Sequence, residues 1–292
     1  MKNNYHINTK ILGLIGHPIK HSFSPFIHNV AFEFKNLDYI YLAFDVPPSN
    51  LKSALKGMIA LGIKGFNVTI PHKENLIQYV NIVSDEASII GSINTVVNDL
   101  GKLTGYNTDV HGILETLLPY KEEISGNEIS VVGAGGAARA VIYTLIRYFK
   151  PAKINLINRT EQRADSLRNY FKDKMKFNSF KTRELFPPDV VNILKDSKLI
   201  VNATSVGMFP DIDDSITSLP DSFVKDQIVF DLVYNPLQTK LLKIAAKQGA
   251  VTLDGLKMLV HQAAKSFELW IGDEMPVDKI YKSLQLFIKE GQ

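Results

Sequence analysis

The stretch Val131-Val132-Gly133-Ala134-Gly135-Gly136-Ala137-Ala138-Arg139 decides how the second half of the chain is interpreted. It follows a β-like run from Glu128 and opens a helical pattern that continues to Tyr148. The glycines therefore lie at a strand-to-helix turn, the context that a dinucleotide-binding G-x-G-x-x-A fingerprint requires. In that fingerprint Gly133 makes the tight turn, Gly135 lets a pyrophosphate approach the backbone, and Ala138 is the small residue where helix packs on strand. The motif by itself leaves a ligand-free glycine-rich turn as the alternative.

The residues around this turn alternate between strand and helix patterns. Further strands are predicted at Lys153–Asn158, Leu199–Ala203 and Ile228–Val233, with helices between them. This alternation is typical of a parallel sheet covered by helices, hence of a Rossmann-type dinucleotide-binding domain. The segment 173–188 has the least regular pattern, and the sequence indicates only a short strand around Phe177–Phe180.

The first hundred residues form a second α/β unit of the same kind. The expected strands are Ile11–Gly16, Tyr39–Val46 and Gly65–Ile70, and the expected helices are Ser24–Asn36 and Leu51–Leu61. The βαβαβ order predicts a mostly parallel sheet. Two further strands, Asn94–Asn98 and Lys102–Tyr106, flank a hairpin-like turn at 99–101, and a helix is expected at Thr108–Leu118.

The predicted organisation is therefore two α/β domains. We expect a substrate-binding and catalytic domain at residues 1–110 and a dinucleotide-binding domain at 111–250, because the polar segment 119–127 marks a boundary. Helical patterns at Gly255–Trp270 and Val277–Lys289 make up 251–292, which we expect to pack back on the first domain. A length of 292 residues fits about two domains.

Composition excludes several classes of function. A net charge of +3 is too small and too dispersed for nucleic-acid binding. No apolar run approaches the ~20 residues of a membrane span, and the polar start of the chain does not read as a signal peptide. The absence of cysteine excludes disulfides and thiolate metal sites and fits a cytoplasmic protein. We expect no metal.

Ser22 and Ser24 follow the first strand and offer two hydroxyls at a helix start. Such a pair suits a substrate carboxylate. The alternative, favoured by spacing alone, is that Ser24 is only the N-cap of a helix with Pro25 in its first turn.

Lys73 ends the third strand segment, Asn67-Val68-Thr69-Ile70-Pro71-His72-Lys73, and opens a predicted helix. Asn67 and Thr69 alternate with apolar residues and can face one side. A cation at a helix start is disfavoured by the dipole, so Lys73 is either a solvated surface group or a residue held for a ligand. Asp109 lies at the start of the helix after the hairpin and is either a cap or the partner of Lys73. A Lys–Asp pair can exchange a proton with a substrate oxygen.

Arg159 occupies the end of the second strand of the dinucleotide-binding unit, where an NAD site usually has an acid for the ribose 2′-hydroxyl. Arg163 follows one helical turn later. Two guanidinium groups suit a 2′-phosphate, so the sequence favours NADP over NAD. The alternative is a pair of solvated arginines on a helix.

The motifs together resemble the shikimate 5-dehydrogenase (shikimate/quinate dehydrogenase) family of aromatic amino acid biosynthesis. The resemblance runs from Gly16 to Gln262, over nearly the whole chain. Its motifs are HSFSP (21–25), NVTIPHK (67–73), GSINT (91–95), GYNTD (105–109), GAGGAAR (133–139), NRTEQR (158–163), NATSVGM (202–208) and GLKMLVHQ (255–262). Ser92 stands where the family commonly has Ala, and Leu232 where Met is frequent.

The resemblance implies an oxidoreductase that reduces 3-dehydroshikimate to shikimate, reversibly, with NADPH. It implies that Lys73 and Asp109 are the catalytic pair. It assigns the substrate carboxylate to Ser22, Ser24 and Tyr234, and the ring hydroxyls or adjacent groups to Thr69, Asn94 and Gln262. For the cofactor it implies the pyrophosphate cradle Gly133, Ala134, Gly135, Gly136 and Ala137, the adenosine-phosphate contacts Asn158, Arg159, Thr160 and Arg163, and the nicotinamide neighbours Thr204, Leu232 and Gly255.

Two other functions remain open from the sequence. One is an NAD-preferring quinate/shikimate dehydrogenase, which an acid at Arg159 or Thr160 would have favoured. The other is a non-catalytic NADP-binding regulator, which loss of Lys73 or Asp109 would have favoured. The expected partners are small molecules, without nucleic acid or membrane, for a monomer or a homodimer.

Overall fold

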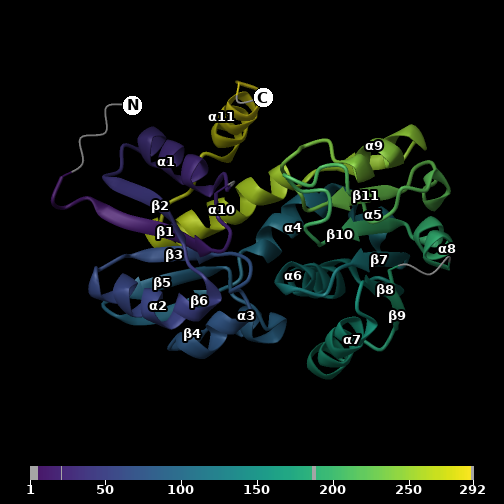
Figure 1. Ribbon diagram of the computed structural model, residues 1–292, viewed down its shortest axis with the longest axis horizontal. Coiled ribbons are helices and arrows are strands. Elements are labelled where there is room, and N and C mark those ends of the chain that lie inside the picture. The colour runs from purple at the N-terminus through teal and green to yellow at the C-terminus, as the bar shows by residue number, and fades with distance from the viewer. Residues whose placement is uncertain (1–5, 21, 186–188, 291–292) are drawn as a thin grey trace. The chain divides into compact units, whose positions relative to one another are not determined.

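The computed structural model describes residues 6–20, 22–185 and 189–290. The chain forms two compact units (Figure 1). Unit 1 comprises Met1–Thr108 and Val260–Gln292, and unit 2 comprises Asp109–Leu259. His21 of the HSFSP motif and residues 186–188 of the irregular segment lie outside the described residues. Among the described helices, none is both long and apolar enough to cross a membrane.

Unit 1 is built on a six-stranded sheet. Its strands are β1 (Lys10–Gly16), β2 (Tyr39–Asp45), β3 (Gly65–Val68), β4 (Ile82–Val83), β5 (Thr95–Asp99) and β6 (Lys102–Tyr106). They are ordered β2-β1-β3-β5-β6-β4, and β5 alone runs against its neighbours. The predictions of a mostly parallel sheet and of a hairpin between β5 and β6 are thus confirmed. Strand β4 was not predicted, because two residues are too few to show a period.

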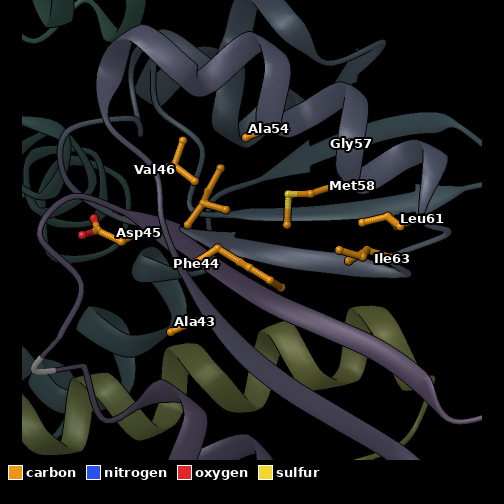
Figure 2. A pocket seen from close by; sticks show the side chains of 10 residues that line it. Ala43, Phe44, Asp45, Val46, Ala54, Gly57, Met58, Leu61 and Ile63 are labelled. Carbon is orange, nitrogen blue, oxygen red and sulfur yellow. The ribbon is translucent and has the colours of Figure 1, made fainter.

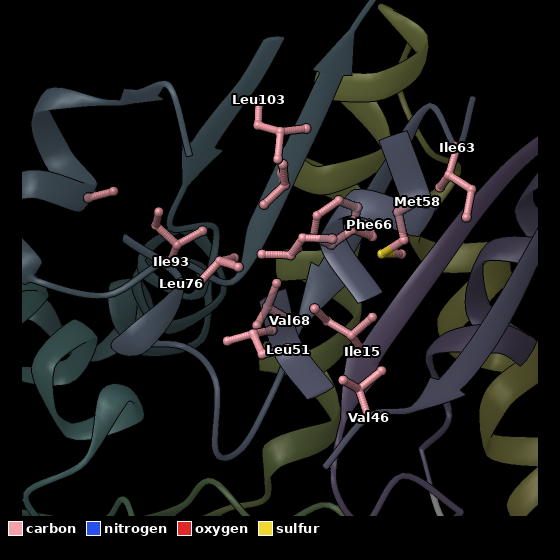
Figure 3. Packing of buried hydrophobic residues seen from close by; sticks show 13 residues of the cluster. Ile15, Val46, Leu51, Met58, Ile63, Phe66, Val68, Leu76, Ile93 and Leu103 are labelled. Atoms are coloured by element: carbon pink, nitrogen blue, oxygen red, sulfur yellow. The ribbon is translucent and has the colours of Figure 1, made fainter. Parts of the chain in front are cut away.

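Helices cover both faces of this sheet. They are α1 (Ser24–Lys35), α2 (Leu51–Ala60), α3 (Asp85–Ile90), α10 (Gly255–Ile271) and α11 (Val277–Glu290), with 3₁₀ turns at Pro48–Asn50 and Asn75–Tyr79. Side chains along β3 alternate between the two faces of the sheet. Phe66 and Val68 pack with Met58 of α2 in one cluster (Figure 3), whereas Asn67 points to the opposite face.

The C-terminal helices return to unit 1, as predicted. The indole N–H of Trp270 donates to the carbonyl of Val96 at 2.9 Å, and a Cβ atom added at Gly65 would overlap that indole ring. Phe287 of α11 stacks on Phe26 of α1 with ring centroids 4.3 Å apart. A glycine in the centre of the sheet, at the start of β3, therefore lets α10 lie close against it.

Asn29 of α1 covers the open edge of the sheet at β2. Its side-chain amide donates to the Tyr41 carbonyl at 3.0 Å and accepts from the Tyr41 N–H at 2.9 Å. The amide thus pairs with the Tyr41 backbone as a neighbouring strand would, which blunts an edge that carries little charge. A shallow apolar depression lies beside this edge between β2 and α2 (Figure 2). It contains none of the residues predicted to carry chemistry.

Unit 2 contains a six-stranded sheet in which every pair is parallel. Its strands are β7 (Glu128–Val132), β8 (Lys153–Asn158), β9 (Phe180–Glu184), β10 (Leu199–Asn202), β11 (Ile228–Asp231) and β12 (Val251–Leu253). The order β12-β11-β10-β7-β8-β9 is that of a Rossmann fold, with the direction of winding reversing between β7 and β10. The predicted Rossmann-type domain is confirmed.

Helices also cover both faces of the second sheet. They are α4 (Asp109–Leu117), α5 (Lys121–Ile124), α6 (Gly136–Thr144), α7 (Glu161–Met175), α8 (Asp189–Asp196) and α9 (Lys240–Lys247), with a π-helical turn at Leu145–Phe149 after α6 and 3₁₀ turns at Leu118–Tyr120 and Pro220–Ser222. Leu194 of α8 and Leu241 of α9 pack on Val132 and Ile200. The strand predicted around Phe177–Phe180 is misplaced, since β9 begins only at Phe180. Its sequence FKTRE gives no apolar alternation by which to locate it.

Removal of the Asn29 amide tests the account of the β2 edge. Asn29→Ala leaves the Tyr41 N–H and C=O without their partner, so we expect unit 1 to lose about 1–3 kcal/mol of stability. Denaturation followed by the fluorescence of Trp270, the one tryptophan of the chain, reports on unit 1. Asn50→Ala is the control, because Asn50 is exposed and its amide oxygen accepts from the Ser49 hydroxyl at 3.4 Å as its one side-chain hydrogen bond to the described residues. Equal unfolding midpoints for the two variants would contradict the assignment.

Candidate active site

The turn between β7 and α6 forms a backbone cradle. Gly133 has φ = 117°, which favours glycine, and its N–H donates to the Ile157 carbonyl at 2.8 Å. A Cβ atom at Gly133 would lie 3.0 Å from the Ala203 carbonyl oxygen, so the turn is pressed against the loop after β10. The space beside Gly135, the residue that precedes α6, is open: an added Cβ atom would meet nothing within 4 Å.

This geometry fits a pyrophosphate. The turn lies at the carboxyl ends of β7 and β10, where a doubly wound sheet binds its ligand. The first turn of α6 directs amide N–H groups and the positive end of the helix dipole to the open space at Gly135. The predicted cradle therefore forms one continuous turn between β7 and α6. It consists of Gly133, Ala134, Gly135, Gly136 and Ala137.

The end of β8 presents two arginines. The Asn158 amide donates to the Thr160 carbonyl at 2.8 Å, which closes the turn before α7. Thr160 is the N-cap of α7, but its hydroxyl makes no capping hydrogen bond. Arg159 and Arg163 are exposed, and neither guanidinium has an ion pair or hydrogen bond to any of the described residues. Both side chains are thus available to a ligand at this corner.

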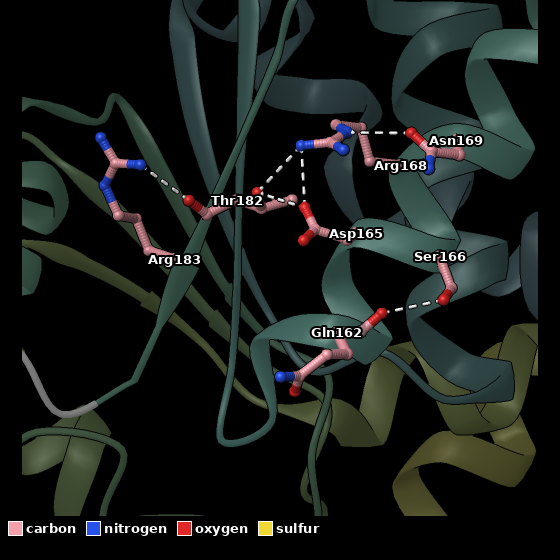
Figure 4. Close-up of polar contacts among 7 residues, drawn as sticks. All are labelled: Gln162, Asp165, Ser166, Arg168, Asn169, Thr182 and Arg183. Carbon is pink, nitrogen blue, oxygen red and sulfur yellow. Dashed lines mark hydrogen bonds and ion pairs between the residues drawn. The ribbon is translucent and has the colours of Figure 1, made fainter.

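Other arginines nearby have structural partners. The Arg168 guanidinium contacts Asp165 at 2.8 Å and donates to the Thr182 hydroxyl at 3.1 Å, which ties α7 to β9 (Figure 4). Arg183 donates to the carbonyl of Thr182 at 2.9 Å. Arg168 and Arg183 thus have partners within the fold, whereas Arg159 and Arg163 have none among the described residues.

The ends of β10 and β11 hold a chain of buried polar residues that no sequence pattern predicted. Asn202 connects Thr204, one of the predicted nicotinamide neighbours, to the carboxylate of Asp231. Burial raises the pKa of Asp231 to about 6, although three hydrogen bonds oppose the rise. Asn202 lies inside the NATSVGM motif, so the motif was visible, but nothing in the sequence paired Asn202 with Asp231.

Leu232 and Gly255 meet beside this chain. The Gly255 N–H donates to the Val233 carbonyl at 3.1 Å, and a Cβ atom at Gly255 would overlap the Leu232 carbonyl oxygen. Glycine is therefore required where α10 starts against the end of β11. Burial also raises the pKa of the preceding carboxyl, Asp254.

The substrate-side predictions divide between the two units. Ser22, Ser24, Thr69, Lys73, Asn94 and Gln262 belong to unit 1, whereas Asp109 and Tyr234 belong to unit 2. The interpretation of Ser24 as an N-cap is wrong, because Phe23 occupies that position and Ser24 is the first residue of α1. Ser24 is buried, and its N–H donates to the Ser22 hydroxyl at 3.2 Å. The two serines thus lie side by side at the start of α1.

Asn94 is held in a buried hydrogen-bond network on the α10 face of the unit 1 sheet. Its side-chain oxygen accepts from the Thr108 N–H at 2.7 Å, so the orientation of its amide is fixed. Asn67 donates to Thr95 and to Ser266, both at 3.0 Å, and accepts from the Tyr41 hydroxyl at 2.7 Å. The network joins β3, β5 and α10, whose Gln262 carbonyl accepts from Ser266 at 3.1 Å.

Lys73 follows β3 in a turn that is fixed on both sides. Its carbonyl accepts from the Ile93 N–H at 2.8 Å, and the ring of the preceding His72 is buried with Nε2 2.6 Å from the Val46 carbonyl. The predicted helix at Lys73 is wrong, since only the 3₁₀ turn Asn75–Tyr79 follows. Lys73 and Thr69 are half-buried, and Asp109 is 3% exposed as the first residue of α4. The Thr108 hydroxyl bonds within the Asn94 network.

Comparison with known proteins gives a consistent match. The family model described as "Shikimate dehydrogenase substrate binding domain" matches residues 14–96. "Shikimate / quinate 5-dehydrogenase" matches residues 117–234, and "Shikimate 5'-dehydrogenase C-terminal domain" matches residues 255–285.

Similar proteins cover nearly the whole chain. A shikimate dehydrogenase (NADP(+)) of Caldanaerobacter subterraneus subsp. tengcongensis is 43% identical, over 95% of this chain and 97% of its own. The crystal structure of shikimate 5-dehydrogenase from Listeria monocytogenes with shikimate and NAD has a TM-score of 0.85 at 36% identity, covering 97% of this chain and 99% of that one. The Thermus thermophilus enzyme with NADP(H) and shikimate has a TM-score of 0.81 at 34% identity, covering 94% and 98%.

Proposed function

The chain belongs to the shikimate/quinate dehydrogenase family, and from that we infer that it catalyses the reversible NADPH-dependent reduction of 3-dehydroshikimate to shikimate in aromatic amino acid biosynthesis. The observation that carries this is the 43% identity to an NADP-dependent shikimate dehydrogenase over 95% of the chain. An NAD-preferring enzyme is not supported, because Arg159 occupies the position where an acidic residue would bind the ribose 2′-hydroxyl of NAD. A non-catalytic regulator is not supported either, because both Lys73 and Asp109 are present.

The residues of unit 2 bind the cofactor in this proposal. When bound, NADPH supplies the hydride that reduces the ketone carbon. Gly133 to Ala137 hold the pyrophosphate, and Asn158 and Thr160 shape the corner at the adenosine phosphate. Arg159 and Arg163, which have no internal partner among the described residues, bind the 2′-phosphate. Thr204, Leu232 and Gly255 border the nicotinamide.

Lys73 and Asp109 transfer the proton in this proposal. As the ketone carbon accepts hydride, its oxygen gains negative charge, which the Lys73 ammonium stabilises and then neutralises by giving up a proton. The family resemblance makes Asp109 the second member of this proton-transferring pair. Two features support these roles. The Lys73 carbonyl accepts a hydrogen bond from the Ile93 N–H, and Asp109 is a buried carboxylate at the start of a helix.

The remaining polar residues position the substrate. Ser22 and Ser24 donate hydroxyls to the substrate carboxylate with help from Tyr234, and the pairing of the two serines at the start of α1 supports this role. Thr69, Asn94 and Gln262 contact the ring hydroxyls or adjacent groups. The fixed amide of Asn94 suits such a role, because its oxygen already accepts from the Thr108 N–H and its NH₂ group can donate to an oxygen of the substrate.

We further propose the domain roles that follow. Residues 1–110 form the substrate-binding domain and 111–250 the NADP-binding domain, while the C-terminal helices of 251–292 pack back on the first domain from Val260 onward. The absence of cysteine suits the cytoplasm, and the protein works as a monomer or homodimer.

A four-way assay tests the function. Shikimate or quinate, each with NADP or NAD, is followed by the absorbance of the reduced nicotinamide. We expect the highest kcat/KM for shikimate with NADP. Higher kcat/KM with NAD, or no turnover in any combination, would contradict the proposal.

Substitution of Lys73 tests the catalytic pair. Lys73→Ala should lower kcat by about 100-fold or more and leave shikimate affinity nearly unchanged, because the lost interaction forms mainly in the transition state. Asp109→Asn should also be severe, and the double variant less than additive. Lys64→Ala, which removes an exposed lysine of the same unit, should keep normal turnover. Near-normal kcat in Lys73→Ala would require another acid.

Substitution of both arginines tests the choice of cofactor. Arg159→Ala with Arg163→Ala should weaken NADP binding by up to about 2–5 kcal/mol while NAD binding hardly changes. The readout is kcat/KM for each cofactor at saturating shikimate. Arg147→Ala, which removes an exposed cation elsewhere in unit 2, controls for net charge. An undiminished preference for NADP in the double variant would mean that the 2′-phosphate is bound elsewhere.

A further inference from the structure

Phe23 occupies the N-cap position of α1, between the two serines that are proposed to bind the substrate carboxylate. Its backbone has φ = −85° and ψ = −4°, and its side chain makes no capping hydrogen bond. Phenylalanine is a poor N-cap, because its ring offers no acceptor to the N–H groups of the first turn. Helix capping therefore does not explain a phenylalanine at this position.

The ring of Phe23 packs on the C-terminal helix α11. Phe287 of α11 lies edge-on to Phe23, with ring centroids 6.3 Å apart and an interplanar angle of 88°. The same Phe287 ring stacks on Phe26, in the first turn of α1, at 4.3 Å and 24°. Both arrangements are favourable for aromatic pairs. Phe287 therefore contacts two rings at the start of α1 at once.

Further contacts hold α11 along α1 (Figure 1). The Lys35 ammonium lies 2.8 Å from the carboxylate of Asp273, which precedes α11. The Lys279 ammonium lies 5.6 Å from the centroid of the Phe34 ring. The two helices thus run antiparallel, and the last turn of α11 lies at the start of α1. Phe287 therefore belongs to a helix whose place beside α1 is also fixed by contacts away from the serines.

Ser22 is held less firmly than Ser24. Its N–H donates to the Ile19 carbonyl at 3.3 Å, and its hydroxyl accepts from the Ser24 N–H at 3.2 Å. These distances lie at or beyond the long end of the usual range for such bonds. Ser24, by contrast, is buried within the helix. The position of Ser22 relative to Ser24 therefore depends on the residue that joins them, Phe23.

The Ser22 hydroxyl is suited to donate to a carboxylate. It accepts from the Ser24 N–H, and its own proton is donated to none of the described residues. A carboxylate can only accept, so a hydroxyl with a free proton matches it. The strength of such a contact depends on where the turn places the hydroxyl.

We propose that Phe287 is a positioning residue that acts through Phe23 to hold the Ser22 hydroxyl in place for the substrate carboxylate. The inference rests on the proposed function, which assigns Ser22 and Ser24 to that carboxylate. It makes the last turn of α11 a part of the substrate site, although Phe287 acts on the substrate only through the turn that it holds.

The test measures the KM for shikimate and kcat at saturating NADP. Phe287→Ala should raise KM about 3–10-fold, the factor that corresponds to the energy of an aromatic pair. It should leave kcat within about twofold, because a carboxylate remote from the reacting carbon is bound equally in the ground state and the transition state. An unchanged KM would overturn the proposal.

Two further variants separate the ring contact from a general loosening of α11. Leu286→Ala is the matched control, since Leu286 is the neighbouring apolar residue, is exposed and has no ring, and it should keep the original KM. Phe287→Tyr keeps the ring, and its hydroxyl can reach water because Phe287 is 45% exposed. It should therefore keep the original KM as well. Equal increases in KM for Leu286→Ala and Phe287→Ala would contradict the proposal.

A double-mutant cycle with Ser22→Ala tests whether Phe287 acts through the serine. Once the Ser22 hydroxyl is removed, its position no longer matters, so Phe287→Ala should raise KM by less than about twofold in the Ser22→Ala background. A purely structural role of Phe287 predicts the same factor in both backgrounds, and that result would overturn the proposal.

Ser22→Ala alone distinguishes failure of this inference from failure of the site assignment. If Ser22→Ala raises KM and Phe287→Ala does not, the serine binds the substrate but α11 does not position it. If Ser22→Ala leaves KM unchanged, the carboxylate is bound elsewhere, and the site assignment fails together with the proposal.

Discussion

The close approach of Gly133 to the Ala203 carbonyl sets the geometry of the cofactor side of this protein. It brings the turn after β7 against the loop after β10, where the direction of the sheet reverses. Side chains larger than glycine do not fit there, because the left-handed φ of 117° and the 3.0 Å contact both oppose a Cβ atom. The same turn lies against Thr204, whose Cγ2 would be 3.1 Å from a Cβ atom at Gly133, and it leaves open space beside Gly135.

In each unit, a network of buried polar groups makes hydrogen bonds to residues of the proposed site or to their neighbours. In unit 2 Asn202 donates to the Asp231 carboxylate and to the Val206 carbonyl, and its oxygen accepts from Thr204. In unit 1 Asn67 and Ser266 brace the strand that follows Asn94. Buried polar groups are costly unless they are fully paired, and a fully paired network specifies one arrangement. Both networks therefore make the neighbouring hydrogen-bonding groups rigid before any ligand arrives.

Local patterns were sufficient to predict most of the fold. Buried strands such as Ile11–Gly16 and Lys153–Asn158 show continuous apolar runs, and the fingerprint identified the turn after β7. β9 was misplaced because an edge strand with polar residues on both faces has no apolar period. Spacing favoured the N-cap as the alternative for Ser24, because spacing does not distinguish the N-cap from the first helical residue.

Tertiary partners were beyond such patterns. Asn67 and Ser266 are 199 residues apart, and Asn202 and Asp231 are 29 apart on separate strands. No periodicity links them, so the sequence pointed to the residues that we propose contact ligands and missed the buried residues that hydrogen-bond within the two units. The family resemblance likewise supplied roles for Lys73 and Asp109 that residue types alone left undecided.

Amide hydrogen exchange with each ligand added alone tests the central claim, that unit 2 binds the cofactor at the ends of β7, β8 and β10. NADP should slow exchange at residues 133–137, 158–163 and 202–206 and leave the amides of residues 67–73 and 92–95 unchanged. Shikimate alone should show the opposite pattern, with slowing in unit 1. Protection by NADP centred on residues 67–73, or absent from 133–137, would contradict the account.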